Sequence, residues 1–276
     1  MAILGINGQP IETIGDDNYG DYLHVRTDEG YEAYGCLPPG GDDMMTTVRA
    51  VPWEASGLVV YDEKELGERL EAMWAAQASI MHRVYHTDCL KQTRGTCWIH
   101  GTCQAAMQLL EMSNLPYRAI SPASVAYHCY SNFGVNGGYP AKGVTEFQEN
   151  GACDLANWPE NGFSRSYDTA TSQANRVHQW LEEVVILDGG GEERFIKLLS
   201  AHVQGKPGGA SFNWWSHYVC SCWGRLDGRE LKLGIRNSWG NSGYGDKGFG
   251  LLAGSRKYPS WACVFLRMRQ SVGEKK

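Results

Sequence analysis

Two short motifs lie far apart in this chain, and one histidine lies between them. Gly95-Thr96-Cys97-Trp98 comes first, Asn237-Ser238-Trp239-Gly240 comes last, and His217 stands in between. A thiol becomes a nucleophile for acyl transfer when a base activates it and a third group orients that base. Here the base would come 120 positions after Cys97, and the orienting amide 140 positions after it. A fold that uses these residues must therefore pack an early segment of the chain against a late one.

Length and charge limit the classes of protein to which the chain can belong. Its 276 residues can bury one large core or two modest lobes. A net charge of -6 and an isoelectric point of about 5.8 give no basic surface for DNA, RNA or an anionic membrane. No apolar run reaches the roughly 18 residues of a spanning helix, and the first residues lack the basic flank of a signal peptide. We expect no nucleic acid and no membrane as partners.

Nine cysteines are many for such a chain, and the number is odd. Without an export signal, we expect them to be reduced thiols that pack as small apolar side chains. Cys220 and Cys222 form a Cys-x-Cys pair, which is a poor half-site for zinc, and no second pair stands at metal-ligand spacing. The sequence predicts no metal and no cofactor.

The chain changes character along its length. Residues 1–60 are rich in Gly, Asp and Pro, and we expect an N-terminal extension of unknown role with a few strands and turns. Periodicity and capping signals predict helices at 63–83, 97–112, from 122, and from 140 to about 150, then at 172–187 and 192–203. Strands are expected at 210–223, 230–237, 247–252 and 262–268. Helices first and strands later predict an α+β fold, with a helical lobe at about 61–155 and a β-rich lobe at about 156–276.

Particular residues set these expected helices. Leu66, Leu70, Met73 and Ala76 form one apolar stripe of the helix at 63–83. Ser121 is an N-cap followed by proline, which predicts a short helix from Pro122. Asn150-Gly151 is a typical helix end.

The helix at 97–112 places Cys97 in its first turn, where the helix dipole favours a thiolate. Gly101-Thr102-Cys103 repeats the same tripeptide six positions later, but Cys103 would lie inside the helix, beyond the reach of the dipole. Cys97 is therefore the better candidate nucleophile. Taken alone, it would more often be a buried structural cysteine.

His217 and Asn237 complete the candidate constellation. We expect the Asn237 side-chain oxygen to accept from Nδ1–H of His217, which would leave Nε2 facing the thiol. Trp239 would cover that hydrogen bond and keep water away from it. Alone, His217 would more often be structural, and Asn-Ser-Trp-Gly would more often be a turn.

Together these motifs resemble the papain family of cysteine proteases. Thr96-Cys97-Trp98, Ser121-Pro122, Asn136-Gly137-Gly138-Tyr139-Pro140, His217 and Asn237-Ser238-Trp239-Gly240 follow the order of that family. Gly243-Tyr244-Gly245-Asp246-Lys247-Gly248-Phe249 resembles a further family segment, so the likeness covers roughly residues 88–276. The resemblance implies a two-lobe fold and hydrolysis of peptide bonds through a Cys-His-Asn triad and an acyl-enzyme. It also implies a protein or peptide substrate.

The resemblance also implies a role for each matching residue. Cys97 would be the nucleophile, His217 the base and acid, and Asn237 the residue that orients His217. Gln92 would donate to the oxyanion together with the Cys97 backbone N–H. Substrate contacts would come from Gly137 and Gly138 along the backbone, from Tyr139 and Pro140 in an apolar pocket, and from Trp239. Trp214 and Trp215 could wall the cleft from the other lobe.

The chain departs from the family at several positions. Arg94 and Val135 stand where the family has the two cysteines of one disulfide, which favours a reducing, cytoplasmic location. Cys129 resembles one end of a second bridge that lacks its partner, so we predict a free thiol. Gln92 lies five residues before Cys97 instead of six, and His100 replaces a usual aromatic; a core histidine is the expected reading.

Two other functions stay open at this point. The chain could be a papain-fold structural or binding subunit of a larger assembly, such as a virion, which docks through residues 1–60 with or without protease activity. It could also be an exopeptidase like the cytosolic bleomycin-hydrolase branch, although the chain is short for the insertions of that branch. The intact Cys97, His217 and Asn237 favour an active thiol peptidase.

Overall fold

The computed structural model describes residues 3–25, 36–37, 48–129, 137–176 and 179–270. Its helices are α1 (Glu63–Ala75), α2 (Ile80–Val84), α3 (Cys97–Met112), α4 (Pro122–Ala126), α5 (Pro140–Asn150), α6 (Ala170–Arg176) and α7 (Gly191–Val203). Its strands are β1 (Glu12–Ile14), β2 (Gln179–Ile186), β3 (Gly208–Phe212), β4 (His217–Asp227), β5 (Glu230–Arg236), β6 (Phe249–Leu252) and β7 (Trp261–Gln270). The predicted α+β class is confirmed.

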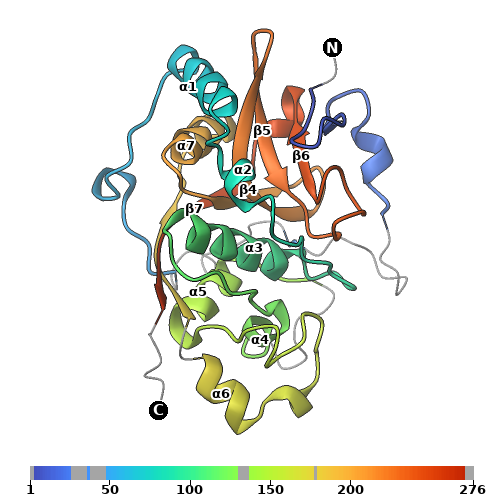
Figure 1. Cartoon of the computed structure of the whole chain (residues 1–276), viewed down its shortest axis with the longest axis vertical. Coiled ribbons are helices and arrows are strands. Elements are labelled where there is room, and N and C mark those ends of the chain that lie inside the picture. The colour runs from blue at the N-terminus through green and yellow to red at the C-terminus, as the bar shows by residue number, and fades with distance from the viewer. Residues whose placement is uncertain (1–2, 26–35, 38–47, 130–136, 177–178, 271–276) are drawn as a thin grey trace.

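One seven-stranded sheet organises the later half of the chain. The strand order is β1-β6-β5-β4-β3-β7-β2. β1 runs parallel to β6, and the other neighbours are antiparallel. In Figure 1, α3, α4, α5 and α6 lie on one side of the molecule, and β4, β5 and β6 lie on the other with α1 and α7. β1 belongs to the first 60 residues, so part of that segment is built into the sheet.

Three helices of the first lobe form where capping signals predict them. α3 runs from Cys97 to Met112, as expected. α4 starts at Pro122, and the Ser121 hydroxyl caps it by accepting from the Ser124 N–H. α5 ends at Asn150, and Gly151 follows with a positive φ of 69°, a conformation that glycine adopts readily.

The predicted helix at 63–83 is wrong in its length. α1 stops at Ala75, where Gln77 takes a positive φ of 53°, and Ser79 caps a separate α2. Leu66 and Leu70 are buried as expected, but Met73 is half-buried and Ala76 is exposed. The chain turns here because α1 packs on α7 and β4, whereas α2 packs on α3 and β4.

The predicted helix at 172–187 is also wrong. Residues 179–186 form strand β2, which pairs antiparallel with β7 and has bulges around Glu183. Val184 and Val185 are buried, and β-branched side chains suit a strand that packs on a core. The predicted strand at 210–223 is two strands, β3 and β4, joined by a turn at 213–216 in which Ser216 has a positive φ of 47°.

The two lobes meet where α3 packs against β4. Every residue of α3 from Cys97 to Leu110 is buried. At Gly101 the helix backbone comes so close to β4 that a Cβ would lie 2.7 Å from the Tyr218 ring and 3.1 Å from the Val219 carbonyl carbon. Only glycine permits this approach, and the contact sets how close Cys97 comes to the start of β4.

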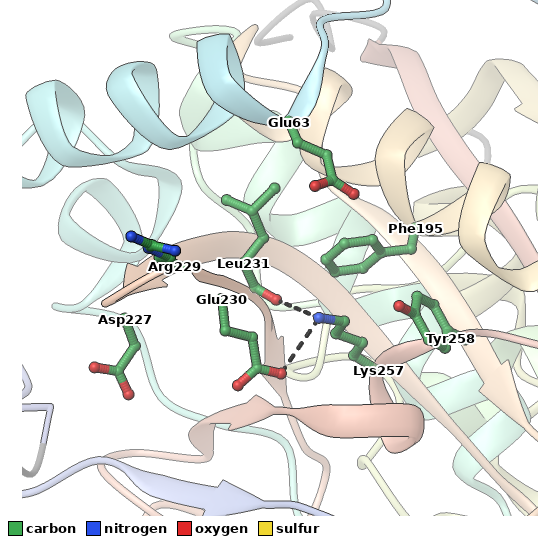
Figure 2. A pocket seen from close by; sticks show the side chains of 8 residues that line it. All are labelled: Glu63, Phe195, Asp227, Arg229, Glu230, Leu231, Lys257 and Tyr258. Carbon is green, nitrogen blue, oxygen red and sulfur yellow. Dashed lines mark hydrogen bonds and ion pairs between the residues drawn. The ribbon is translucent and has the colours of Figure 1, made fainter.

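A separate concavity of about 470 Å³ opens beside the start of β5, at the N-terminal end of α1. Figure 2 shows Lys257 reaching across it to Glu230 and to the Leu231 carbonyl. Its Nζ lies 2.9 Å from that carbonyl oxygen and 3.3 Å from the carboxylate. Because this buried lysine is neutralised by its own neighbours, we interpret the concavity as a structural feature of the turn between β4 and β5.

We predict that Gly101→Ala lowers the free energy of unfolding by about 1–3 kcal/mol, because the new methyl group clashes with Tyr218 and the β4 backbone. Helix propensity alone would raise the free energy of unfolding by about 1 kcal/mol on replacing glycine by alanine. The sign of the measured change therefore distinguishes the clash from the effect of propensity. Urea unfolding measures it. Gly67→Ala in α1 is the control, since its Cβ would meet only the flexible end of Leu226. A stabilised Gly101→Ala would contradict the close packing.

His202 of α7 gives a prediction about pH. Its ring lies between the Lys206 carbonyl (Nδ1, 2.9 Å) and the Ser221 hydroxyl (Nε2, 2.8 Å), and burial lowers its pKa to about 4. A folded pKa below the unfolded one means that this contribution to stability is complete above about pH 6.5 and is lost as the pH falls toward 4.

His202→Gln should therefore flatten the pH dependence of stability by about 1.4 kcal/mol per pH unit between about pH 4.5 and 6. Urea unfolding at a series of pH values tests this. His24→Gln, at an exposed position, controls for the loss of any histidine. If the unfolding free energies of the two variants have the same slope against pH, the His202 ring is not a buried neutral imidazole in the folded protein.

Candidate active site

Cys97 is the first residue of α3, and its side chain is fully buried. Thr96 is the N-cap residue but forms no side-chain capping bond to the helix. The structure thus puts the thiol where the helix dipole is positive and where no capping hydroxyl competes for the first amides. The rival Cys103 lies well inside α3, fully buried, and burial raises its pKa far above the usual range.

His217 and Asn237 meet as the motifs predict. His217 opens β4, Asn237 follows the last residue of β5, and both are fully buried. The ring Nε2 lies 2.8 Å from Asn237 Oδ1. Our expectation of Nδ1 on the asparagine is therefore wrong: Nε2 binds Asn237. The Trp215 and Trp239 rings that pack against the imidazole set its orientation.

Aromatic rings surround this histidine. Trp239 lies 5.3 Å from the His217 ring, tilted by 31°, and Trp215 meets the same ring edge-on at 4.7 Å. Trp215 is buried, and its indole N–H donates to the Tyr22 carbonyl, while Trp214 stacks on it at 5.1 Å. Trp239 and Trp215 thus both pack against the His217 ring, beside its hydrogen bond to Asn237.

Burial also sets the charge of the histidine. It lowers the pKa of His217 to about 4, against an opposing contribution from the hydrogen bond to Asn237. In the state described here the imidazole is neutral at pH 7. An ion pair between thiolate and imidazolium would require this site to become more polar.

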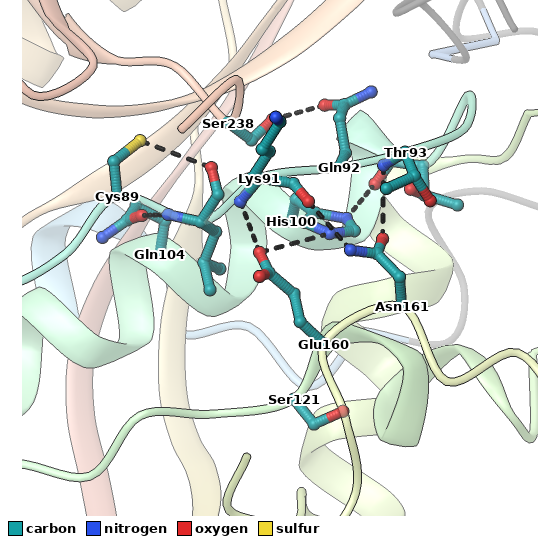
Figure 3. Close-up of polar contacts among 12 residues, drawn as sticks. Cys89, Lys91, Gln92, Thr93, His100, Gln104, Ser121, Glu160, Asn161 and Ser238 are labelled. Carbon is teal, nitrogen blue, oxygen red and sulfur yellow. Dashed lines mark hydrogen bonds and ion pairs between the residues drawn. The ribbon is translucent and has the colours of Figure 1, made fainter. Parts of the chain in front are cut away.

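Gln92 lies on the loop that leads to α3. Its backbone N–H donates to the Ser238 carbonyl at 2.9 Å, and its side-chain Oε1 accepts from the Ser238 hydroxyl (Figure 3). The amide Nε2 donates one hydrogen to the Arg94 carbonyl at 2.8 Å. The structure thus brings Gln92 onto the Asn-Ser-Trp-Gly motif.

Of the two glycines predicted to line the substrate backbone, Gly138 lies against α3. Gly138 packs so tightly on Trp98 that a Cβ would come within 2.5 Å of the indole. Tyr139 is the half-buried N-cap of α5, and Pro140 is its buried first residue. Gly137 is half-buried. Asn136, the first residue of that motif, and Val135 lie outside the described residues.

A short piece of the N-terminal segment lies between Gly138 and Ser216, a space that we call the groove, and the motifs did not predict this. Cys36 forms a parallel bridge with Gly138, and the Leu37 N–H donates to the Gly138 carbonyl at 3.1 Å. On the opposite side, the Cys36 N–H donates to the carbonyl of Ser216, the residue before His217, at 3.2 Å. Two residues of the chain thus span from the α3 side to the β4 side, beside a fully buried Cys97 and His217.

No protein-family model matches this sequence, and no curated protein matches it. Solved structures do match. Xylellain, a cysteine protease from Xylella fastidiosa, aligns with a TM-score of 0.59 at 15% identity, over 90% of this chain and 99% of that chain. ProCathepsin B S9 from Trypanosoma congolense gives 0.57 at 12% identity, over 86% and 87%. Bromelain from Ananas comosus, solved with the inhibitor E64, gives 0.55 at 12% identity, over 68% and 98%. The chain has the papain-like fold.

The papain-like fold explains why the motifs converge although the sequence has drifted so far. One lobe supplies α3 with Cys97, and the other supplies β4 and the end of β5 with His217 and Asn237. The resemblance drawn from the motifs is confirmed at the level of the fold.

The cysteines of this papain-like chain are all described, and all nine are buried thiols without a disulfide. Cys129 is one of them, as predicted. Arg94, at the position of a family cysteine, instead places its guanidinium 5.8 Å from the Phe163 ring centre. Among the described residues, no group of three or more His, Cys, Asp or Glu side chains could hold a metal ion. Every helix in the described part of the chain is too short or too polar to span a bilayer.

Sequence reasoning missed two participants near the site. One is the Cys36–Leu37 segment, whose contacts are made by backbone atoms that no motif records. The other is Glu160, a carboxylate beneath the Gln92 loop, 3.8 Å from His100. The sequence Trp158-Pro159-Glu160-Asn161 is typical of a surface turn, so no local signal indicates that Glu160 contacts His100.

Proposed function

We propose that this chain is a papain-like cysteine peptidase that cleaves peptide bonds through an acyl-enzyme. The observation that carries the proposal is the 2.8 Å contact between His217 Nε2 and Asn237 Oδ1. A cysteine at the first turn of α3 supports it, because a thiol nucleophile needs a base and a group that orients the base.

The reaction follows from these positions. His217 Nδ1 takes the Cys97 proton, and the thiolate attacks the peptide carbonyl carbon. The Cys97 backbone N–H and the Gln92 side-chain amide stabilise the oxyanion. The imidazolium, held by Asn237, then protonates the leaving amine. Water activated by the same imidazole hydrolyses the thioester and regenerates the thiol.

A thiol-directed probe tests this proposal. A peptidyl vinyl sulfone should add to Cys97, mapped by mass spectrometry, and His217→Ala should reduce the rate of labelling by at least about 10²-fold through loss of the base. Cys103 is the internal control, because it is buried and its pKa is raised. Labelling of Cys103 in place of Cys97, or equal labelling in His217→Ala, would contradict the proposed site.

We further propose that residues 36–37 keep the peptidase inactive by covering its site. They belong to the first segment of about 60 residues, and the peptidase domain itself is formed by residues 61–276. Their backbone N–H groups bond to Ser216 and Gly138, on the two sides of the site. A peptide substrate that uses the same carbonyls must displace them. The buried Cys97 and the low pKa of His217, about 4, suit a site that is covered until then.

Cys36→Pro should speed vinyl sulfone labelling of Cys97 by about 3- to 10-fold, because it removes the N–H that donates to Ser216, a net contribution of about 1 kcal/mol. Cys36→Ser keeps that N–H and is the matched control, since both variants lack the thiol. Equal labelling rates in the two variants would show that this backbone bond does not cover the site.

A further inference from the structure

A half-buried acid and a fully buried histidine lie directly beneath the Gln92 loop. Figure 3 shows the Glu160 carboxylate reaching the backbone N–H of Lys91 on one side and the His100 ring on the other. Glu160 Oε1 accepts from that N–H and lies 3.8 Å from His100 Nε2. His100 is fully buried, and Glu160 keeps only 24% of its side-chain exposure. Neither residue belongs to the triad.

The tautomer of His100 follows from its other contact. Nδ1 lies 3.0 Å from the Thr96 carbonyl oxygen, and a carbonyl can only accept, so Nδ1 carries a hydrogen. In a neutral ring, Nε2 then presents a lone pair to the Glu160 carboxyl oxygen. The 3.8 Å between these two atoms is longer than a hydrogen bond, and Nε2 has no hydrogen-bond partner within the described structure. Two acceptors face each other unless a proton lies between them.

The surroundings place that proton on the acid. Burial raises the pKa of Glu160 to about 7 and lowers the pKa of His100 to about 4. Lys91, an exposed cation, and its backbone N–H oppose the shift of Glu160. The Cys89 and Cys103 thiols also face Glu160, and both stay neutral because burial raises their pKa. Below about pH 7 the pair is a neutral carboxylic acid beside a neutral imidazole.

The two contacts of the pair lead to the two oxyanion donors. The Thr96 carbonyl belongs to the same planar peptide group as the Cys97 N–H, so holding that oxygen fixes the direction of the N–H. On the other side, the Lys91 N–H precedes Gln92 by one residue. Asn161 supports the same loop, since its amide donates to the Lys91 carbonyl at 2.8 Å and accepts from the Thr93 N–H at 3.3 Å.

We propose that His100 and Glu160 share one proton and position both oxyanion donors, the Cys97 N–H and Gln92. They are positioning residues, because they act through the 96–97 peptide and the 91–92 loop. This inference rests on the proposed function. The Thr96 carbonyl also accepts from the backbone N–H groups of Ile99 and His100, both at 3.1 Å. An aromatic side chain at position 100 would fill the same space and leave these two bonds in place, but it could not add the ring hydrogen bond or use a proton from Glu160.

Three variants separate the steps of this argument. Glu160→Gln keeps an acceptor for the Lys91 N–H and a donor for His100 Nε2, but it cannot titrate. Glu160→Ala and His100→Phe remove the contacts. Glu146→Gln in α5 is the matched control, a buried glutamate whose pKa is also raised by burial, hydrogen-bonded to Asn150 and apart from the Gln92 loop.

The full chain, with Cys36 and in the Cys36→Pro background, is assayed for kcat and KM on a fluorogenic peptide from pH 5 to 9. Iodoacetamide alkylation of Cys97 is followed in parallel, because it needs the thiolate but no oxyanion donor. Glu160→Ala and His100→Phe should lose about 10- to 100-fold in kcat, less than the 10²–10³ for removal of a donor, with KM and alkylation changed less than about threefold.

The wild type and Glu146→Gln should also lose kcat above about pH 7, where Glu160 gives up the shared proton. Glu160→Gln should keep wild-type kcat at pH 6 within about threefold and lack that alkaline decline. A decline of kcat above about pH 7 that persists in Glu160→Gln would contradict the positioning role of His100 and Glu160. Wild-type kcat in both Glu160→Ala and His100→Phe would also contradict it. A parallel fall in alkylation would also overturn it, because the nucleophile itself would then be disturbed.

Failure of the proposed function gives a different result. A protein that hydrolyses no peptide in either background contradicts the peptidase and, with it, the positioning role. The shared proton is then read directly from the ¹⁵N shift of His100 Nε2. A midpoint near pH 7 that disappears in Glu160→Gln supports proton sharing, and a shift that does not change over this range contradicts it.

Discussion

The close approach of α3 to β4 is the contact on which the rest of the site depends. The glycine at position 101 lets the helix backbone lie against Tyr218, one residue after His217. This contact joins the two lobes and sets the separation of a thiol carried by a helix from a ring carried by a strand. Catalytic geometry tolerates errors of only about 1 Å, so a well-packed interface is needed to hold it.

A second constraint is that the reacting groups are buried. Cys97 and His217 have no exposed surface, and a charged pair in such a place costs free energy that only solvent or a bound substrate offsets. In the structure described here, the backbone N–H groups of residues 36 and 37 donate to the carbonyls of Ser216 and Gly138 on the two sides of the groove. In our proposal, the charge state of the site is therefore linked to what lies in the groove.

Capping and spacing predicted much of this structure. α3, α4 and α5 begin or end at local signals such as Ser121 and Gly151, because those residues satisfy helix-end groups within a few positions of the chain. The strand at 179–186 and the break after Ala75 were missed, since both depend on distant partners, β7 in one case and α7 in the other. Periodicity within a segment carries no information about such partners.

The sequence by itself determined the reacting residue types, their order along the chain and the helix that carries Cys97, because each depends on side-chain chemistry or on neighbours within a few residues. Only the tertiary structure decided that Nε2 of His217 faces Asn237, that Cys36 lies in the groove and that Glu160 lies beside His100. These are contacts between segments far apart in sequence. Ring orientation and backbone hydrogen bonds are set by packing, which no local motif records.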